Sequence, residues 1–309
     1  MLDSLTTDAL TPIVRRALEN PFAVPTAWQW SPIAYKRYLS ARTLARVDGT
    51  ADTGRGGVLA PWSVVVKIFQ PPTDCADSAT EDGSWEREVL AYRSGLLADL
   101  PGALVAPRVL DIHTDDSGNR WLWLEHITDM YGVWPRQHYG VAARRLGYFN
   151  GTYMTSRQLP EYSWLDRDWA KSLSDPAVQV EAIDGLLSHP LAREAFDRPL
   201  AGRARALLED QPHFLRILSE LPQTLCHHDA ARANVFARLA NNDGMETETV
   251  AIDWEGIGPG TVGADLATLV FGTMRRCEFP SSEAAALDQL AFEGYLHGLR
   301  DSGWRGEHQ

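Results

Sequence analysis

The chain has 309 residues and a mass of 34.3 kDa, with 44% hydrophobic and 23% charged residues, a composition typical of globular proteins. Its length suits two lobes of about 100–200 residues each. The net charge of −12 disfavours a nucleic-acid partner, because DNA binding depends on neutralising phosphates with cationic side chains. The larger share of the acidity lies after residue 126, which favours a cationic substrate in that half, although solubility explains the same excess.

Cysteine usage and the N-terminal segment bear on the cellular compartment. Cys75, Cys226 and Cys277 are too few and too far apart for a disulfide framework or a thiolate metal site. The N-terminus carries acidic residues early and lacks the apolar run of a secretory signal. No stretch reaches the roughly 18 apolar residues of a membrane-spanning helix. These features predict a cytoplasmic protein without membrane contact.

The first elements along the chain are a helix and a β-hairpin. An amphipathic helix is predicted over 8–20, where apolar residues recur on one face before Pro21. The stretches 38–47 and 58–69 are β-rich and flank a loop crowded with turn-forming residues. This pattern predicts an antiparallel hairpin with a wide turn.

The rest of the first 126 residues continues the β-rich character around one helix. Helical spacing of apolar residues predicts a helix from Trp85 to Leu96 behind a Ser84 cap. Two further β-runs within 108–127 flank the turn from Asp115 to Asn119. We therefore expect a sheet with a single internal helix in this part of the chain.

The second part of the chain is mainly helical. One β-like region lies at 224–254, between segments with helical periodicity. The expected helices are 138–158, 178–188, 200–219, 263–277 and 283–300. The fold class is therefore α+β, with a small β-rich N-terminal lobe at 1–126 and a larger, mainly helical C-terminal lobe at 127–309.

Oxygen-bearing side chains gather in the β-like region. Short apolar runs are expected to present Asp229, Asn234 and Asp253 at loop ends. Two carboxylates and a carboxamide suit Mg²⁺, which binds through one or two side-chain oxygens together with substrate phosphates. The cluster therefore predicts magnesium together with a nucleotide.

The order His227-x-Asp229-x4-Asn234, followed by an apolar strand and Asp253, resembles the catalytic loop and metal-binding turn of the aminoglycoside phosphotransferase and choline kinase family. That family shares the protein-kinase fold. The resemblance implies that Asp229 is the catalytic base for a substrate hydroxyl, and that Asn234 and Asp253 hold Mg²⁺ on the nucleotide phosphates. His227 would brace the loop. His228 replaces the family's usual glycine and is expected either at the surface or in the substrate cleft.

A lysine inside an apolar strand adds a second point of resemblance. Lys67 lies in the run 63–69 and is one of three lysines against 26 arginines. A buried ammonium needs a partner. Glu88 stands where the kinase fold places the glutamate that pairs with the strand lysine, with Glu86 as the alternative. Lys67 would then reach the α- and β-phosphates; otherwise it is an edge-strand lysine that extends to solvent.

Two more segments match the family by position. The β-run that ends in Leu124, Glu125 and His126 stands at the hinge between lobes, where backbone groups would bind the nucleobase. Asp265, in the sequence Gly263-Ala-Asp-Leu-Ala, would brace the catalytic loop, cap a helix, or do both.

The sequence also departs from the family pattern. No glycine occurs between Trp28 and Leu44, so the glycine-rich loop that should cover the phosphates is unrecognisable. Ala231 stands where relatives often carry a polar or positive side chain that faces the transferring phosphoryl group. Arg232, one residue on, is expected to supply that charge, or else to be a solvent-exposed arginine.

The resemblance implies a kinase that moves the γ-phosphoryl group of ATP or GTP to a hydroxyl of a small molecule, such as an aminoglycoside or another amino-containing metabolite. Asp166, Trp169 and Glu255 are among the residues available for its pocket. A second hypothesis takes a Ser or Thr of a ribosomal peptide as acceptor, but only 11 residues separate Asp253 from Asp265, which favours a small acceptor or a peptide presented by a partner protein. A third is a nucleotide-binding pseudokinase.

Overall fold

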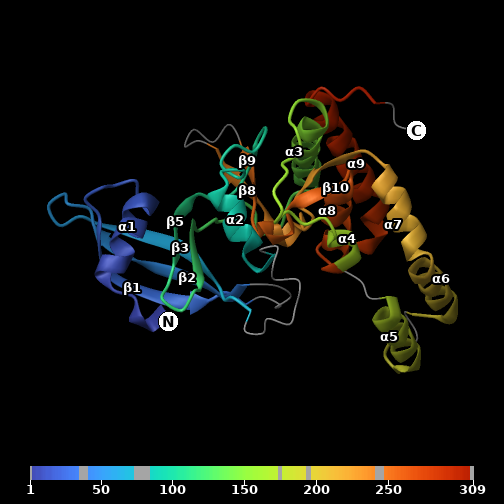
Figure 1. Cartoon of the computed structure of the whole chain (residues 1–309), viewed down its shortest axis with the longest axis horizontal. Coiled ribbons are helices and arrows are strands. Elements are labelled where there is room, and N and C mark those ends of the chain that lie inside the picture. The colour runs from blue at the N-terminus through green and yellow to red at the C-terminus, as the bar shows by residue number, and fades with distance from the viewer. Residues whose placement is uncertain are drawn as a thin grey trace.

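A computed structural model describes residues 2–34, 41–72, 84–172, 176–192, 196–240 and 247–306. The N-terminal sheet lies at one end of the molecule and most helices at the other (Figure 1). The mixed α+β architecture is the one that the sequence predicts. Within the described ranges, no helix combines the length and the apolar character needed to cross a membrane.

Five antiparallel strands form the N-terminal sheet. Their spatial order is β1 (Val24–Pro32), β2 (Ala41–Asp52), β3 (Leu59–Phe69), β6 (Arg120–Glu125) and β5 (Val109–Thr114). The predicted hairpin is confirmed as β2 and β3, with β2 extending to Asp52 and residues 38–40 lying outside the described residues. The sequence missed β1, an edge strand whose side chains are mostly exposed and so lack an alternating pattern.

Helix α1 (Thr7–Ala17) covers one face of this sheet (Figure 1). Thr6 caps the helix by accepting a hydrogen bond from the Ala9 amide at 3.3 Å. Leu10, Ile13 and Val14 are buried and pack in a hydrophobic cluster with the inward side chains of the strands. The predicted helix at 8–20 is confirmed, although it ends three residues earlier.

Helix α2 (Arg87–Arg93) is shorter than the predicted helix from Trp85 to Leu96. Residues Ser84–Glu86 form a 3₁₀ turn, and Glu86 rather than Ser84 occupies the N-cap position. The C-terminal end follows from Gly95, whose φ of 79° lies in the left-handed region that stops helices. Glu88 is nevertheless buried on this helix.

Helices α3 (Arg136–Thr155) and α9 (Ala284–Asp301) form the centre of the C-terminal lobe and lie beside each other (Figure 1). Glycines permit their close approach: a Cβ on Gly298 would lie 1.9 Å from the Arg144 carbonyl oxygen, and one on Gly147 would lie 2.2 Å from that of Tyr295. Both helices were predicted to within a few residues.

The remaining helices show one wrong prediction. The segment 200–219 forms two helices rather than one, because Asp210 and Pro212 interrupt it. A short helix in the segment before α5 was not predicted. The helices are α4 (Trp169–Ser172), α5 (Pro176–Ser188), α6 (Arg198–Glu209), α7 (Gln211–Glu220) and α8 (Ala264–Arg275).

Short strands frame the loops that carry the oxygen-bearing side chains. The three-stranded sheet has the order β4 (Leu104–Val105), β9 (Thr247–Ala251) and β8 (Val235–Leu239), and a separate pair joins β10 (Gly258–Thr261) to β7 (Gln223–Cys226). The β-like character of 224–254 is thus confirmed. The loop between β7 and β8 and the turn after β9 lie at adjacent strand ends, because the Ile252 amide bonds the Asn234 carbonyl at 2.9 Å.

Candidate active site

Lys67 of β3 forms the centre of a charged cluster drawn from three distant segments. Its Nζ donates hydrogen bonds to both carboxylate oxygens of Glu88 on α2, at 2.9 and 2.7 Å. The same Nζ lies 2.7 Å from Oδ1 of Asp253, which follows β9. The structure therefore places the lysine between the two carboxylates, and Glu86 instead pairs with Arg120. The alternative of a solvent-reaching lysine is wrong, because Lys67 is buried.

Burial and the neighbouring charges shift the pKa values of Lys67 and Asp253 in opposite directions. Burial disfavours the charged form of Lys67, but the carboxylates of Asp253 and Glu88 outweigh it and raise the pKa of Lys67. Burial likewise works against an ionised Asp253, but Lys67 outweighs it and lowers the pKa of Asp253. Lys67 is therefore a cation beside an ionised Asp253 at neutral pH.

His227 and Asp265 hold the loop that follows β7. The His227 Nε2–H donates to the Ile252 carbonyl at 2.9 Å, while its Nδ1 accepts the Asp229 amide at 3.2 Å. The buried Asp265 carboxylate accepts the amides of His227 and His228 at 3.1 and 2.8 Å, and the Asn150 side chain at 3.0 Å. Because Gly263 occupies the N-cap of α8, the carboxylate of Asp265 braces the loop rather than capping the helix.

His228 is buried, so its expected place at the surface is wrong. Its φ of 69° lies in the left-handed region, which residues other than glycine adopt infrequently. Nδ1–H donates to the Gly256 carbonyl at 2.7 Å, and the ring stacks on Trp169 with centroids 5.9 Å apart. Burial lowers the pKa of His228, which keeps the ring neutral.

Asp229 and Asn234 lie at the two ends of the same loop and contact each other. Asn234 Nδ2 donates to Asp229 Oδ2 at 2.8 Å and to the Asp229 carbonyl at 3.0 Å. This bonding turns the amide oxygen of Asn234 away from Asp229. Burial raises the pKa of Asp229, with Asp253 adding to the effect and His227 opposing it. A carboxylate with a raised pKa is suited to accept a proton.

Arg232 has partners other than a phosphoryl site. Its guanidinium pairs with the carboxylate of Asp129, donates to the Val235 carbonyl at 3.2 Å, and lies 4.3 Å from the centre of the Trp134 ring. Its side chain is only 12% exposed, so it is not a solvent-exposed arginine either. The structure therefore corrects the solvent-exposed alternative and places the charge of Arg232 against Asp129, in the segment that joins the lobes.

The hinge residues lie where β6 leaves the sheet. Leu124 is buried in the strand between β3 and β5, and the Glu125 amide donates to the Arg108 carbonyl at 3.0 Å. His126 Nδ1 lies 3.0 Å from Ser63 Oγ. The amide of Glu125 is thus bonded within the sheet, and the role of residues 124–126 toward a nucleobase stays a prediction.

Two residues beside the cluster, Glu255 and Arg87, were not assigned to it from the sequence. Glu255 was named only among the residues available for an acceptor pocket, and Arg87 was not named. Burial, together with the charges of Asp253 and Glu88, raises the pKa of Glu255 to about 8. Arg87 precedes Glu88 and bonds the Glu255 carbonyl at 2.8 Å. The sequence shows that Arg87 precedes Glu88, but this position alone does not predict where the Arg87 side chain points.

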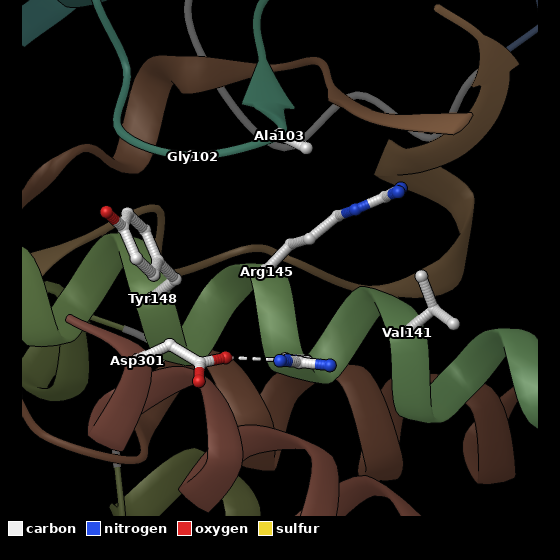
Figure 2. Close-up of a pocket in the computed structure, with 7 residues that line it drawn as sticks. Gly102, Ala103, Val141, Arg145, Tyr148 and Asp301 are labelled. Atoms are coloured by element: carbon white, nitrogen blue, oxygen red, sulfur yellow. Dashed lines mark hydrogen bonds and ion pairs between the residues drawn. The ribbon is translucent and has the colours of Figure 1, made fainter. Parts of the chain in front are cut away.

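An open hollow of about 290 Å³ lies away from this cluster, beside α3 and the end of α9 (Figure 2). None of the charged cluster residues lines it, and Arg144 on its wall pairs with Asp301 at 2.7 Å. Its lining is Gly102, Ala103, Val141, Arg144, Arg145, Tyr148 and Asp301.

Comparison with known proteins gives one family and a common fold. A model described as the phosphotransferase enzyme family matches residues 50–304. An amicoumacin kinase solved in complex with AMP-PNP, Ca²⁺ and Ami is 16% identical, with a TM-score of 0.50 over 90% of this chain and 74% of that one. No curated protein matches the sequence significantly.

Two further solved structures resemble the chain. An aminoglycoside-3'-phosphotransferase of type VIII is 19% identical, with a TM-score of 0.44 over 90% of this chain and 94% of that one. An aminoglycoside phosphotransferase from Alicyclobacillus acidocaldarius is 13% identical, with a TM-score of 0.48 over 86% of this chain and 79% of that one. The amicoumacin kinase, with its TM-score of 0.50, indicates a kinase-like fold.

Proposed function

The chain belongs to the phosphotransferase enzyme family, and from this premise we propose that it transfers the γ-phosphoryl group of ATP or GTP to a hydroxyl group of a small molecule. The observation that carries the proposal is the cluster in which Lys67 contacts Glu88 and Asp253. In the loop after β7, Asn234 donates a hydrogen bond to the carboxylate of Asp229. Phosphoryl transfer depends mainly on positioning and electrostatic stabilisation, and this cluster supplies fixed charges of both signs.

Each side chain of the cluster has a role that follows from its contacts. Asp229 accepts the proton of the acceptor hydroxyl, because its pKa is raised and Asn234 fixes one of its oxygens. Lys67, held by Glu88, offers its ammonium to the phosphates. Asp265 and His227 keep the loop in place through their backbone contacts.

The donor set suits a magnesium ion. Asp253 and the amide oxygen of Asn234 are the proposed ligands, and Glu255 lies two residues beyond Asp253 in the same turn. Mg²⁺ usually binds through one or two carboxylates and completes its shell with substrate phosphates and water. When bound, the ion neutralises charge on the transferring group.

We propose an amino-containing acceptor, such as an aminoglycoside or a related metabolite. The net charge of −12 and the acidic second half of the chain favour a cationic ligand. The brief stretch between Asp253 and Asp265 supports a small acceptor rather than a peptide. A cytoplasmic location is proposed as well, because Cys226 and Cys277 are free cysteines and the reaction consumes a nucleoside triphosphate.

The test is turnover of ATP and GTP with Mg²⁺ against amino sugars, amino alcohols, nucleosides and hydroxyl-bearing peptides. Asp229→Asn is expected to retain nucleotide binding, measured by thermal stabilisation, and to lose about 10²–10⁴-fold in kcat. Asp288→Asn on the exposed face of α9 is the matched control and should keep full activity.

Three outcomes separate the hypotheses. Acceptor-stimulated turnover that needs Asp229 supports the proposed kinase and names its acceptor class. Full turnover in Asp229→Asn contradicts the role given to this carboxylate. Nucleotide binding without turnover on any acceptor favours the pseudokinase.

A further inference from the structure

Arg87 and Glu88 are neighbours on α2 that contact opposite sides of the site. Glu88 bonds Lys67 of the N-terminal sheet. The Arg87 guanidinium extends to the C-terminal lobe, where Nε donates to the Trp164 carbonyl at 2.6 Å and Nη1 to Asp166 Oδ2 at 2.9 Å. Nη1 also bonds the Glu255 carbonyl at 2.8 Å. One short helix therefore contacts both lobes through consecutive side chains.

The Arg87 ion pair is largely withdrawn from solvent. The side chains of Arg87 and Asp166 are only 12% and 13% exposed. A pair in such surroundings is screened far less by salt than a surface pair, and removing one partner leaves an uncompensated charge. Loss of either partner is therefore costly, because the remaining charge stays buried without its counter-charge.

Asp166 is itself fixed to the turn after Asp253. Its amide donates to the Ile257 carbonyl at 3.0 Å, and its Oδ1 accepts the Asp168 amide at 2.9 Å. A Cβ on Gly258 would lie 1.9 Å from the Asp166 carbonyl oxygen, so the two backbones are in direct contact. Arg87 thus binds two segments that contact each other, 164–168 and the turn 254–258.

Helix α2 depends on such contacts for its orientation. It has only seven residues, and its N-cap residue Glu86 makes no side-chain capping bond. Helices of this length are marginal in isolation and are stabilised by tertiary packing. Lys67 Nζ and Glu88 Oε1 lie 2.9 Å apart, so a small rotation or shift of α2 would lengthen this contact beyond hydrogen-bond distance.

We propose that Arg87 is a positioning residue that locks α2 to the segment 164–168 and to the turn after Asp253, and so keeps Glu88 on Lys67. This inference rests on the proposed function of the same site. The partners of the Arg87 guanidinium are the Trp164 carbonyl, the Asp166 carboxylate and the Glu255 carbonyl. It acts by tying the lysine–glutamate pair and the turn that bears Asp253 into one unit across the two lobes.

The test compares Arg87→Ala with Arg93→Ala, which removes an exposed arginine from the same helix. Arg87→Ala is expected to raise the nucleotide KM about tenfold and to lower kcat about tenfold, a loss of about 100-fold in kcat/KM. Asp166→Ala should behave alike, and the double variant should be no worse than about the larger single effect. Arg87→Lys should recover part of the loss.

Hydrogen exchange gives a readout independent of turnover. Amides of residues 87–93 should exchange at least about tenfold faster in nucleotide-free Arg87→Ala than in Arg93→Ala. If the wild-type chain turns over and Arg87→Ala matches Arg93→Ala in both kinetics and exchange, the inference is overturned. If the wild-type chain transfers no phosphoryl group, the proposed function fails, and the exchange of α2 still decides the positioning role.

Discussion

His228, in the loop that follows β7, lies against Gly260 of β10. A residue with a Cβ in the left-handed region costs about 1–2 kcal/mol, so the φ of 69° at His228 requires compensation. The ring obtains it from the Gly256 carbonyl and from stacking on Trp169. It also needs a neighbour without a side chain, because a Cβ on Gly260 would lie 2.3 Å from His228 Nε2.

Gly260→Ala is therefore expected to destabilise the chain by about 1–3 kcal/mol, the usual cost of overpacking. In the His228→Gly background the same change should cost much less, because the clashing ring is gone. Urea unfolding measures both steps. Gly202→Ala is the control, since a Cβ there meets nothing within 4 Å. Equal costs of Gly260→Ala in the two backgrounds would contradict this account.

The family resemblance indicated which side chains would meet, but not the direction of every one of them. Lys67 with Glu88 and Asp229 with Asn234 were expected together from the family resemblance, and the structure places each pair in contact. Arg232 was expected to face the same centre. It lies in a 3₁₀ turn, where each residue rotates the side-chain direction by about a third of a turn. Its partner Asp129 is remote in sequence, so spacing gave no signal.

At the scale of elements, the segment that joins the lobes is bound to β8. Asp129 accepts hydrogen bonds from Trp134 Nε1 at 3.2 Å and from the Ala237 amide at 3.0 Å, besides the ion pair with Arg232. The Met130 amide donates to the Ala237 carbonyl at 2.8 Å. Movement of this segment is therefore tied to the loop that carries Asp229.

Arg232→Ala and Asp129→Ala should each lower the free energy of unfolding by about 3–5 kcal/mol, because each leaves a buried charge without its partner. The double variant should cost clearly less than the two losses added. Urea unfolding of all three measures the coupling. Arg216→Ala is the control, since its exposed pair with Glu220 is worth at most about 0.5 kcal/mol. Additive losses would show that the two residues act separately.

Periodicity predicted the elements that bury one face. Helices α3, α8 and α9 were found because apolar residues recur toward a shared core. Strand β1 was not predicted, because most of its residues are exposed and its sequence therefore lacks alternating apolar and polar residues. The division between α6 and α7 was also missed, since apolar spacing continues across the break at Asp210.

At the scale of the molecule, the N-terminal sheet separates two hydrophobic clusters. Leu10, Val64 and Val66 belong to the cluster under α1. Phe69, on the other face, belongs to a cluster that continues through α2 and Leu146 of α3 into the C-terminal lobe. Apolar packing therefore crosses the expected border between residues 126 and 127, which a division based on secondary-structure type does not reveal.

Leu10→Ala should lower the free energy of unfolding by about 2–5 kcal/mol, because Leu10 is fully buried beneath the sheet. The continuous core predicts that unfolding remains one transition, shifted but not split. Urea unfolding followed by tryptophan fluorescence and by circular dichroism tests this. Leu207→Ala, at a 60% exposed position, should change little. Two separated transitions would show that the lobes unfold independently.

The contacts of Lys67 also determine how the chain reacts with amine-directed reagents. Only an uncharged amine attacks an acylating group, and the ammonium of Lys67 is kept protonated by Glu88 and Asp253. A reagent in free solution would therefore leave it unmodified. A reagent delivered on a nucleotide phosphate would compete with those carboxylates for the same side chain. Since the chain has just three lysines, acylation at Lys67 would yield a single, easily assigned peptide and report occupancy of the site in a mixture of proteins.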